Sequence, residues 1–154
     1  MTKRRVNVRG IIWRDGKLLA VKHKNSDGSE VDYWAIPGGG LDPHESLHDG
    51  VARELMEETA ITAQVGKLLF MQQFNSKRRD HTEELEFFFQ IDNPEDFVDI
   101  DLSLTTHGDE EIARIEFVNP KEVLIYPRFL SDVDIAAYTR QHQPVYIADN
   151  FNES

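Results

Sequence analysis

Three glutamates in the middle of the chain, Glu54, Glu57 and Glu58, lie at positions i, i+3 and i+4. In a helix this spacing directs all three carboxylates to one face, where they repel one another, so helix stability does not require them. Hard divalent cations such as Mg²⁺ prefer oxygen ligands and hold substrate phosphates at the same time. The cluster therefore favours a metal-dependent phosphate site, and a solvated acidic helix face is the alternative that the spacing alone leaves open.

These glutamates need a helix to hold them, and the surrounding sequence predicts one over residues 45–59. Its apolar positions recur every four residues, at Leu47, Val51 and Leu55. They form a stripe that is separate from the acids. Ser46 is a candidate N-cap, and Asp42 with Pro43 is an alternative start. A run of three glycines at 38–40 precedes the helix and is typical of a turn.

Strand-like runs make up most of the remaining sequence. Asp15 and Gly16 lie between two alternating apolar runs, which is typical of a two-residue β-hairpin. Further strands are expected at residues 33–36, 65–74, 85–91 and 112–118. A second helix is expected at 131–141, and the polar residues from about 148 onward are expected to form a frayed tail. These elements predict a single α/β domain over residues 1–154, in which one or two helices cover the strands.

The composition of the 154 residues excludes several classes of protein. Lys and Arg number 17 against 28 Asp and Glu, and the net charge of −11 argues against general nucleic-acid binding, which needs clustered cations. The chain has no cysteine, so it has no disulfide, thiolate zinc site or cysteine nucleophile, and a cytoplasmic location fits. No apolar run approaches the roughly 20 residues of a membrane span, so no membrane partner is expected.

Residues 39–61 together resemble the Nudix box, whose pattern is G-x5-E-x7-R-E-U-x-E-E-x-G-U, where U is a bulky aliphatic residue. The matching residues are Gly39, Glu45, Arg53, Glu54, Leu55, Glu57, Glu58 and Ile61. Ala60 stands where the family has glycine, and because the left-handed conformation is costly for alanine we expect the helix end to adjust around it. The resemblance implies a Nudix-type α/β/α sandwich with a mixed, curved central sheet and two main helices.

The same resemblance implies a hydrolase that uses a divalent cation. The acids that match the family's metal ligands are Glu54, Glu57 and Glu58. Gly39, with Gly38 beside it, matches the loop that brings the backbone close to the metal and the phosphates. The expected cofactor is Mg²⁺, for which Mn²⁺ can substitute. By bridging carboxylates and pyrophosphate oxygens, such ions neutralise developing charge and lower the pKa of a bound water.

The resemblance assigns supporting roles to other residues. Glu45 and Arg53 match the pair that braces the helix and orients Glu54. A further acid is expected in the loop 107–111, where Glu111 is the preferred candidate and an ordinary solvated acid is the alternative interpretation. Glu54 and Glu111 are the two candidates for the general base.

An anionic nucleotide substrate also needs cations and a surface for its base. The candidate cations lie near the first hairpin and between the long strands, at Arg9, Lys22, Lys24, Lys77, Arg78 and Arg79. A solvated basic side chain is the alternative for each of them taken singly. The aromatic residues that could stack on a base are Trp34, Tyr33 and Phe74. Aromatic residues in strands are, however, more often part of the core.

The expected reaction is hydrolysis of a nucleoside diphosphate linked to another group, by attack of water on one phosphorus. The substrate remains open, because residues 76–79 lack the proline and the tyrosine that mark two of the family's subgroups. The possible substrates are nucleoside triphosphates, nucleotide sugars and related small-molecule nucleotides. The alternative function is a catalytically silent Nudix-fold domain that binds or senses a nucleotide. A homodimer is a further expectation, since many members of the family are dimers.

Overall fold

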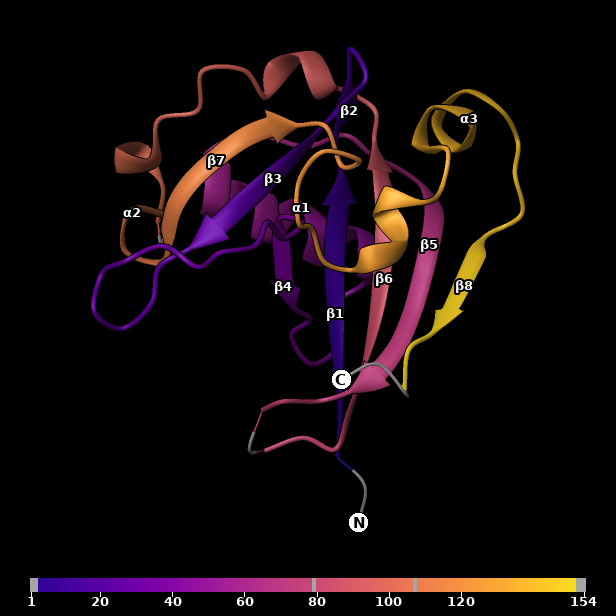
Figure 1. The fold of residues 1–154 in the computed structure, drawn as a ribbon, viewed down its shortest axis with the longest axis horizontal. Helices are drawn as coiled ribbons and strands as arrows, with labels where there is room; N and C mark the ends of the chain where they lie inside the picture. The colour runs from indigo at the N-terminus through magenta and orange to yellow at the C-terminus, as the bar shows by residue number, and fades with distance from the viewer. Residues whose placement is uncertain (1–2, 79, 107, 152–154) are drawn as a thin grey trace.

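The computed structural model describes residues 3–78, 80–106 and 108–151, which form two β-sheets and three α-helices (Figure 1). The larger sheet has the order β4-β1-β6-β5-β8 and contains β1 (Arg4–Ile11), β4 (Gly38–Gly40), β5 (Val65–Asn75), β6 (Glu83–Ile91) and β8 (Tyr146–Asp149). The smaller sheet has the order β2-β3-β7 and contains β2 (Trp13–Arg14), β3 (Lys17–His23) and β7 (Ile112–Val118). The helices are α1 (Leu47–Thr59), α2 (Gly108–Glu111) and α3 (Ile135–Arg140), and the short 3₁₀ turns are η1 (Pro94–Asp96), η2 (Leu102–Leu104) and η3 (Arg128–Ser131). None of the described helices has the length and apolar character that a membrane span needs.

The larger sheet is mixed, as expected, because β1 runs parallel to β6 whereas β4 is antiparallel to β1 and β5 is antiparallel to β6. The chain leaves this sheet after β1 and enters the smaller sheet through the predicted hairpin. Asp15 and Gly16 have φ angles of 52° and 76°, the left-handed pair that a type I′ turn requires. The α/β fold class is therefore confirmed, with two sheets in place of the single curved sheet that was expected.

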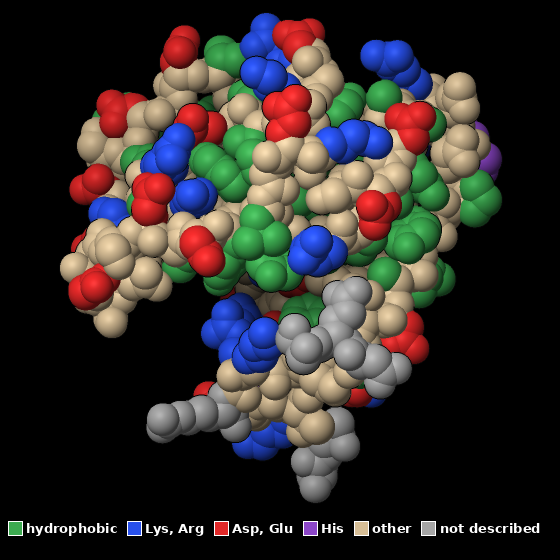
Figure 2. Space-filling view, in the orientation of Figure 1, with side chains coloured by type: hydrophobic (Ala, Val, Ile, Leu, Met, Phe, Trp, Pro, Cys, Tyr) green, Lys and Arg blue, Asp and Glu red, His purple; other side chains and the backbone are tan. Residues whose placement is uncertain are grey.

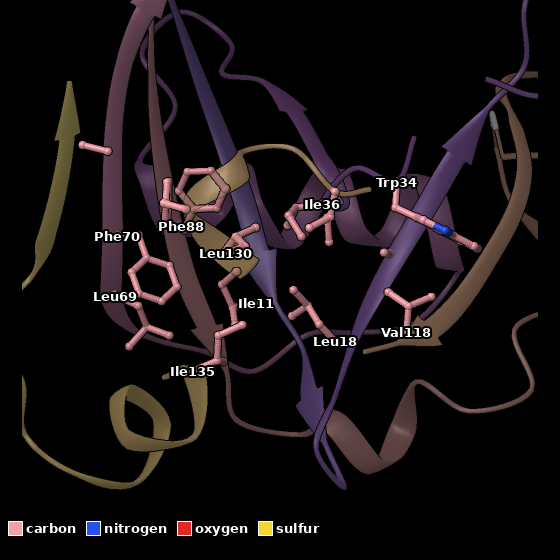
Figure 3. Packing of buried hydrophobic residues seen from close by; sticks show 14 residues of the cluster. Ile11, Leu18, Trp34, Ile36, Leu69, Phe70, Phe88, Val118, Leu130 and Ile135 are labelled. Atoms are coloured by element: carbon pink, nitrogen blue, oxygen red, sulfur yellow. The ribbon is translucent and has the colours of Figure 1, made fainter. Parts of the chain in front are cut away.

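Alternation along the strands sends neighbouring apolar residues into two separate cores. The first core, part of which Figure 3 shows, includes Ile11, Leu18, Phe70, Phe88, Leu130 and Ile135. The second core includes Ile12, Leu19, Phe89, Val51 and Leu55. Since α3 contributes Ile135 to the first core and α1 contributes Val51 and Leu55 to the second, the helices cover the strands from two sides (Figure 1). Each large apolar side chain that is fully buried stabilises the fold by about 1.5–3 kcal/mol.

Two segments near the C-terminus differ from the sequence expectation. The helix expected at 131–141 is shorter and is preceded by η3, because Asp134 begins a new helix by accepting a hydrogen bond from the N–H of Ala137 at 3.1 Å. Residues 148–150, which were expected to belong to a frayed polar tail, are held in the fold, because β8 pairs in parallel with β5, Ala148 is buried and the N–H of Asn150 donates to the carbonyl of Gln73. The five-stranded sheet is therefore completed by a short strand, Tyr146–Asp149, that was not predicted.

Two segments before α1 also differ in detail. The glycine run at 38–40 forms strand β4 along β1 instead of a free turn. Residues 33–36 form isolated bridges, in which Trp34 pairs with Ile125 and Ala35 pairs with Val21. Both differences bring the chain that leads into α1 against the sheets.

The N-terminal end of α1 agrees with the sequence prediction, whereas its C-terminal end does not. The hydroxyl of Ser46 accepts a hydrogen bond from the N–H of Asp49 at 3.1 Å, which confirms the predicted N-cap. At the other end Ala60 itself takes the left-handed conformation, with φ 61° and ψ 21°, so the expectation that the helix end would adjust is wrong. The buried Thr59 hydroxyl donates to the carbonyl of Leu55 at 2.6 Å and accepts from the N–H of Ile61 at 3.2 Å. These two bonds hold the turn and impose the strain on Ala60.

We expect Ala60→Gly to raise the free energy of unfolding by about 1 kcal/mol, because glycine avoids the roughly 1–2 kcal/mol that a Cβ costs in this conformation but loses more backbone entropy. Urea denaturation measures the change. Ala137→Gly in α3 is the matched control, since the same replacement inside a helix should lower stability by about 1 kcal/mol. A loss of stability in Ala60→Gly as large as that of the control would contradict the strain.

Candidate active site

Strand β4 brings the backbone of the box against α1 because its residues carry no side chains. Gly38 has a φ of 144°, and a Cβ at this position would lie 2.1 Å from the carbonyl oxygen of Val8. A Cβ on Gly39 would lie 2.7 Å from Glu54 Oε2. A larger residue at either position would displace β1 or the carboxylate of Glu54. The glycines therefore place the backbone directly beside one of the expected metal ligands.

Arg53 joins three of the four acids of the box into one group. Its Nε donates to Glu45 Oε2 at 2.8 Å, and its Nη2 donates to the carbonyl of Gly40 at 2.9 Å. Its Nη1 donates to Glu54 Oε1 at 3.0 Å and lies 3.3 Å from Glu57 Oε1. Hydrogen bonding to Glu45 is the main cause that raises the pKa of Arg53, and the same bond lowers the pKa of Glu45. These contacts are the ones that a bracing role for Glu45 and Arg53 requires.

Only one of the two carboxylate oxygens of Glu58 is hydrogen-bonded among the described residues. Oε1 accepts the N–H of Gly38 at 3.2 Å, whereas the buried Oε2 has no partner among the described residues. Burial raises the pKa of the Glu58 carboxylate to about 8, and the charge of Glu54 adds to this effect. Burial also raises the pKa of Glu54, although Arg53 opposes the change. An ionised oxygen without a partner is costly in such a place, so the site is suited to a cation.

Glu111 reaches the same region from a distant part of the chain. It is the last residue of α2, which packs on the end of α1 so closely that a Cβ on Gly108 would lie 3.1 Å from the carbonyl oxygen of Glu58. After burial, the charge of Glu111 is one of the further causes that raise the pKa of Glu58. Lys24, a candidate substrate contact, instead donates from Nζ to the carbonyl of Asp109 at 2.6 Å. The structure thus brings Glu111 near the box and ties Lys24 to α2.

The box acids fit a divalent cation that shares its coordination shell with a substrate. Within residues 3–78, 80–106 and 108–151, no three acidic or histidine side chains already form a metal cage, and Glu54 and Glu57 both contact Arg53. Mg²⁺ in proteins commonly uses one or two carboxylates, and waters and phosphate oxygens complete its octahedron. The free Oε2 of Glu58 and the carboxylate of Glu54 beside Gly39 are suitable oxygen ligands for such an ion.

A cleft of about 370 Å³ lies on the face of the larger sheet that Arg9 occupies. None of its described lining residues belongs to residues 39–61, and Arg9, whose charge acts on Glu58, is the lining residue that links the cleft to the box acids. Figure 2 shows this side of the molecule hollowed, with Lys and Arg side chains next to the hollow. Among the residues that line the cleft are Arg9, His23, Tyr33, Gln72, Phe74, Lys77, Arg78, Glu86, Tyr126 and Asn150. Five of the nine candidate cations and aromatic residues, Arg9, Tyr33, Phe74, Lys77 and Arg78, therefore lie together in this cleft. Arg79 and His107 lie outside the described residues.

Trp34 and Lys22 do not line this cleft. Trp34 is only 7% exposed and belongs to the first core. Lys22 Nζ lies 5.3 Å from the centre of the Trp34 ring and 3.6 Å from Glu30 Oε1, so both side chains have partners inside the protein. The aromatic residue that is better placed to contact a base is Tyr33, which packs edge-on against Tyr126 with ring centres 5.2 Å apart.

The floor of the cleft is a buried polar network that the sequence analysis did not predict. Glu86 accepts hydrogen bonds from Arg9 Nε at 3.0 Å and from Gln72 Nε2 at 2.5 Å. Asn7 Nδ2 donates to Glu84 at 2.8 Å and to Glu86 at 3.1 Å. The two glutamates are spaced by two residues along β6, so they point to the same face of the sheet. This spacing is the signal that could have indicated a polar cleft.

Comparison with known proteins places these features in a family. The NUDIX domain profile matches residues 3–139. Phosphatase NudJ of Escherichia coli (strain K12) is 30% identical over 156 residues, which cover 99% of this chain and 95% of that protein.

Two solved structures share the fold. The E. coli ORF135 protein has a TM-score of 0.65 at 23% identity, covering 92% of this chain and 96% of that one. A UDP-X diphosphatase has a TM-score of 0.64 at 20% identity, covering 96% of this chain and 68% of that one. Because the domain profile spans most of the chain and NudJ aligns with nearly all of it, the chain belongs to the Nudix hydrolase family.

Proposed function

We propose that this hydrolase cleaves the diphosphate bond of a nucleoside diphosphate linked to another group, with Mg²⁺ as its cofactor and Mn²⁺ as a substitute. The observation that carries the proposal is the buried, unpartnered Oε2 of Glu58, which lies beside Gly38 in the same group of acids as Glu54. A carboxylate oxygen in this position is suited to a divalent cation that also holds phosphates. The names of two similar proteins, phosphatase NudJ and UDP-X diphosphatase, are consistent with chemistry at a phosphoanhydride.

The proposal gives each residue of the box a defined task. Glu54, Glu57 and Glu58 would hold the cation, which when bound would neutralise phosphate charge and lower the pKa of a bound water. Because Gly39 has no side chain, the Glu54 carboxylate can lie directly against the backbone of β4. Arg53 keeps the Glu54 carboxylate in place through its hydrogen bond of 3.0 Å.

The attacking water must lose a proton to a base. Its attack forms one P–O bond and breaks the bond from that phosphorus to the bridging oxygen, which leaves with the other product. Glu54 and Glu111 are the two candidates for the base, since Glu54 lies against Gly39 and Glu111 is exposed at the end of α2. Arg9, half-buried beside Glu86, is the candidate cation between the box and the cleft.

A catalytically silent domain that binds or senses a nucleotide is the competing proposal. Such a domain would be expected to lack one or more acids of the box, whereas this chain has all of them. Nucleotide binding without phosphate release in the presence of Mg²⁺ would favour it. The homodimer and the cytoplasmic location stay predictions, which light scattering and cell fractionation measure.

We expect Glu57→Gln to reduce kcat by about a hundredfold or more, because an amide oxygen is a weaker Mg²⁺ ligand than a carboxylate. The assay measures phosphate released from nucleoside triphosphates and nucleotide sugars with Mg²⁺ or Mn²⁺, after coupling to a phosphatase. Glu122→Gln is the matched control, since Glu122 is exposed in the loop after β7. Equal turnover by the two variants would count against metal binding by Glu57.

Without metal, the enclosed carboxylate of Glu58 should make stability fall as the pH rises. Its pKa of about 8 in the folded protein lies above the ordinary value of 4.5, so the folded state binds more protons than the unfolded state between these values. Glutamine resembles the protonated acid. We therefore expect Glu58→Gln to raise the free energy of unfolding by on the order of 1–3 kcal/mol at about pH 8, and to change it little at about pH 4. Urea denaturation in EDTA measures the free energy of unfolding at both pH values. An equal effect of the substitution at the two pH values would contradict the raised pKa.

A further inference from the structure

Arg5 is a half-buried arginine without a counter-ion. Its neighbour Arg4 is ion-paired with Glu83, and Arg9, further along the same strand, is paired with Glu86. Across residues 3–78, 80–106 and 108–151, the Arg5 guanidinium has neither an ion pair nor a side-chain hydrogen bond. A guanidinium carries five N–H donors, and charged groups that are removed from water are normally paired. Arg5 therefore has binding capacity that the described chain does not use.

The acids near Arg5 are already engaged by other groups. Glu84 and Glu86 both accept hydrogen bonds within the polar network of the cleft floor. Arg78, at the rim of the cleft, lies with its Nε 4.0 Å from Glu84 Oε1. Three guanidinium groups, those of Arg5, Arg9 and Arg78, thus lie around Glu84 and Glu86, and the charges of Glu58 and Glu54 also attract Arg9. Of these three arginines, Arg5 is the one without an ion pair among the described residues.

The electrostatics of Arg5 agree with its lack of an ion pair. Burial, and then the charge of Arg78, lower the pKa of the Arg5 guanidinium, although Glu84 attracts it. A cation behaves in this way when its surroundings lack sufficient negative charge. An anion that binds from solution would supply the missing negative charge.

The position of Arg5 relative to the box follows from the pleat of β4. Side chains at positions 39 and 40 would point to opposite faces of the strand. A Cβ on Gly39 would meet Glu54 Oε2 at 2.7 Å, whereas a Cβ on Gly40 would meet Arg5 Nη2 at 3.0 Å. Strand β4 lies at the edge of its sheet. The box acids therefore lie on one face of an edge strand without side chains, and Arg5 lies on the other.

We propose that Arg5, together with Arg78, binds a phosphate group of the substrate that extends across β4, beyond the diphosphate held at the box acids. The proposal rests on the proposed pyrophosphohydrolase function and narrows its substrate. Nucleoside triphosphates, which carry a third phosphate, are favoured over nucleotides whose second group is an uncharged sugar. Arginine suits this task because its planar guanidinium donates two parallel hydrogen bonds to a phosphate.

Binding of inorganic pyrophosphate in EDTA tests Arg5 without metal or turnover. Calorimetric titration compares the wild-type chain with Arg5→Gln, Arg5→Lys and Arg4→Gln, after urea denaturation has shown that each variant folds. Arg4→Gln is the matched control, because it removes the same charge from an exposed side chain that is paired with Glu83. We expect Arg5→Gln to weaken binding about tenfold or more, Arg5→Lys to weaken it less and Arg4→Gln to leave it nearly unchanged. Equal affinities of Arg5→Gln and Arg4→Gln would overturn the proposal.

Substrate preference provides a second readout. We expect Arg5→Gln to lower kcat/KM for a nucleoside triphosphate about tenfold relative to kcat/KM for a nucleoside diphosphate sugar, and Arg4→Gln to leave this ratio unchanged. An equal loss on both substrates would overturn the selective role, because a structural defect acts on both alike. If the wild-type chain hydrolyses neither substrate with Mg²⁺ or Mn²⁺, the proposed function fails, and the pyrophosphate titration still decides whether Arg5 binds phosphate.

Discussion

The guanidinium group of Arg53 ties together the three parts of the chain that the site needs. It donates to Glu45 in the segment before α1, to the carbonyl of Gly40 in β4 and to Glu54 within α1. Charge-assisted hydrogen bonds of this kind are shorter and stronger than neutral ones. They hold the helix in one orientation against β4, and they offset the repulsion between carboxylates that share a helix face. The acids can therefore lie close together before any cation binds.

Strand β4 has no room for side chains, because α1 crowds position 39 and β1 crowds positions 38 and 40. The contacts that a Cβ would make with Glu54 at position 39 and with Arg5 at position 40 lie on opposite faces of the strand. A thin edge strand thus separates an acidic side from a basic side. A substrate with several phosphates needs both, because the acids hold a cation for one part of its charge and arginines bind another part. The overall charge of −11 conceals this local division.

Sequence patterns predicted the features that depend on near neighbours in the chain. The cap at Ser46 and the acidic face of α1 follow from spacings of three and four residues. Features that depend on distant contacts were not predictable in this way. Strand β8 is held by its pairing with β5, Trp34 is covered by side chains from other strands, and Glu84 is buried by partners that the sequence does not place near it. Ala60 lies between these cases, because the local pattern marks the left-handed position but the bonds of Thr59 decide that alanine must occupy it.

Mn²⁺ binding, measured by electron paramagnetic resonance, tests most directly whether the acidic face of α1 is a cation site. The free ion gives a strong solution signal that bound ion loses, so the measurement does not depend on knowing the substrate. It compares the wild-type chain with the double variant Glu57→Gln and Glu58→Gln, at a pH above the raised pKa of Glu58 of about 8. We predict that the wild-type chain removes the free signal and that the double variant, while still folded, does not. Equal loss of the signal in the two proteins would contradict a metal site on α1.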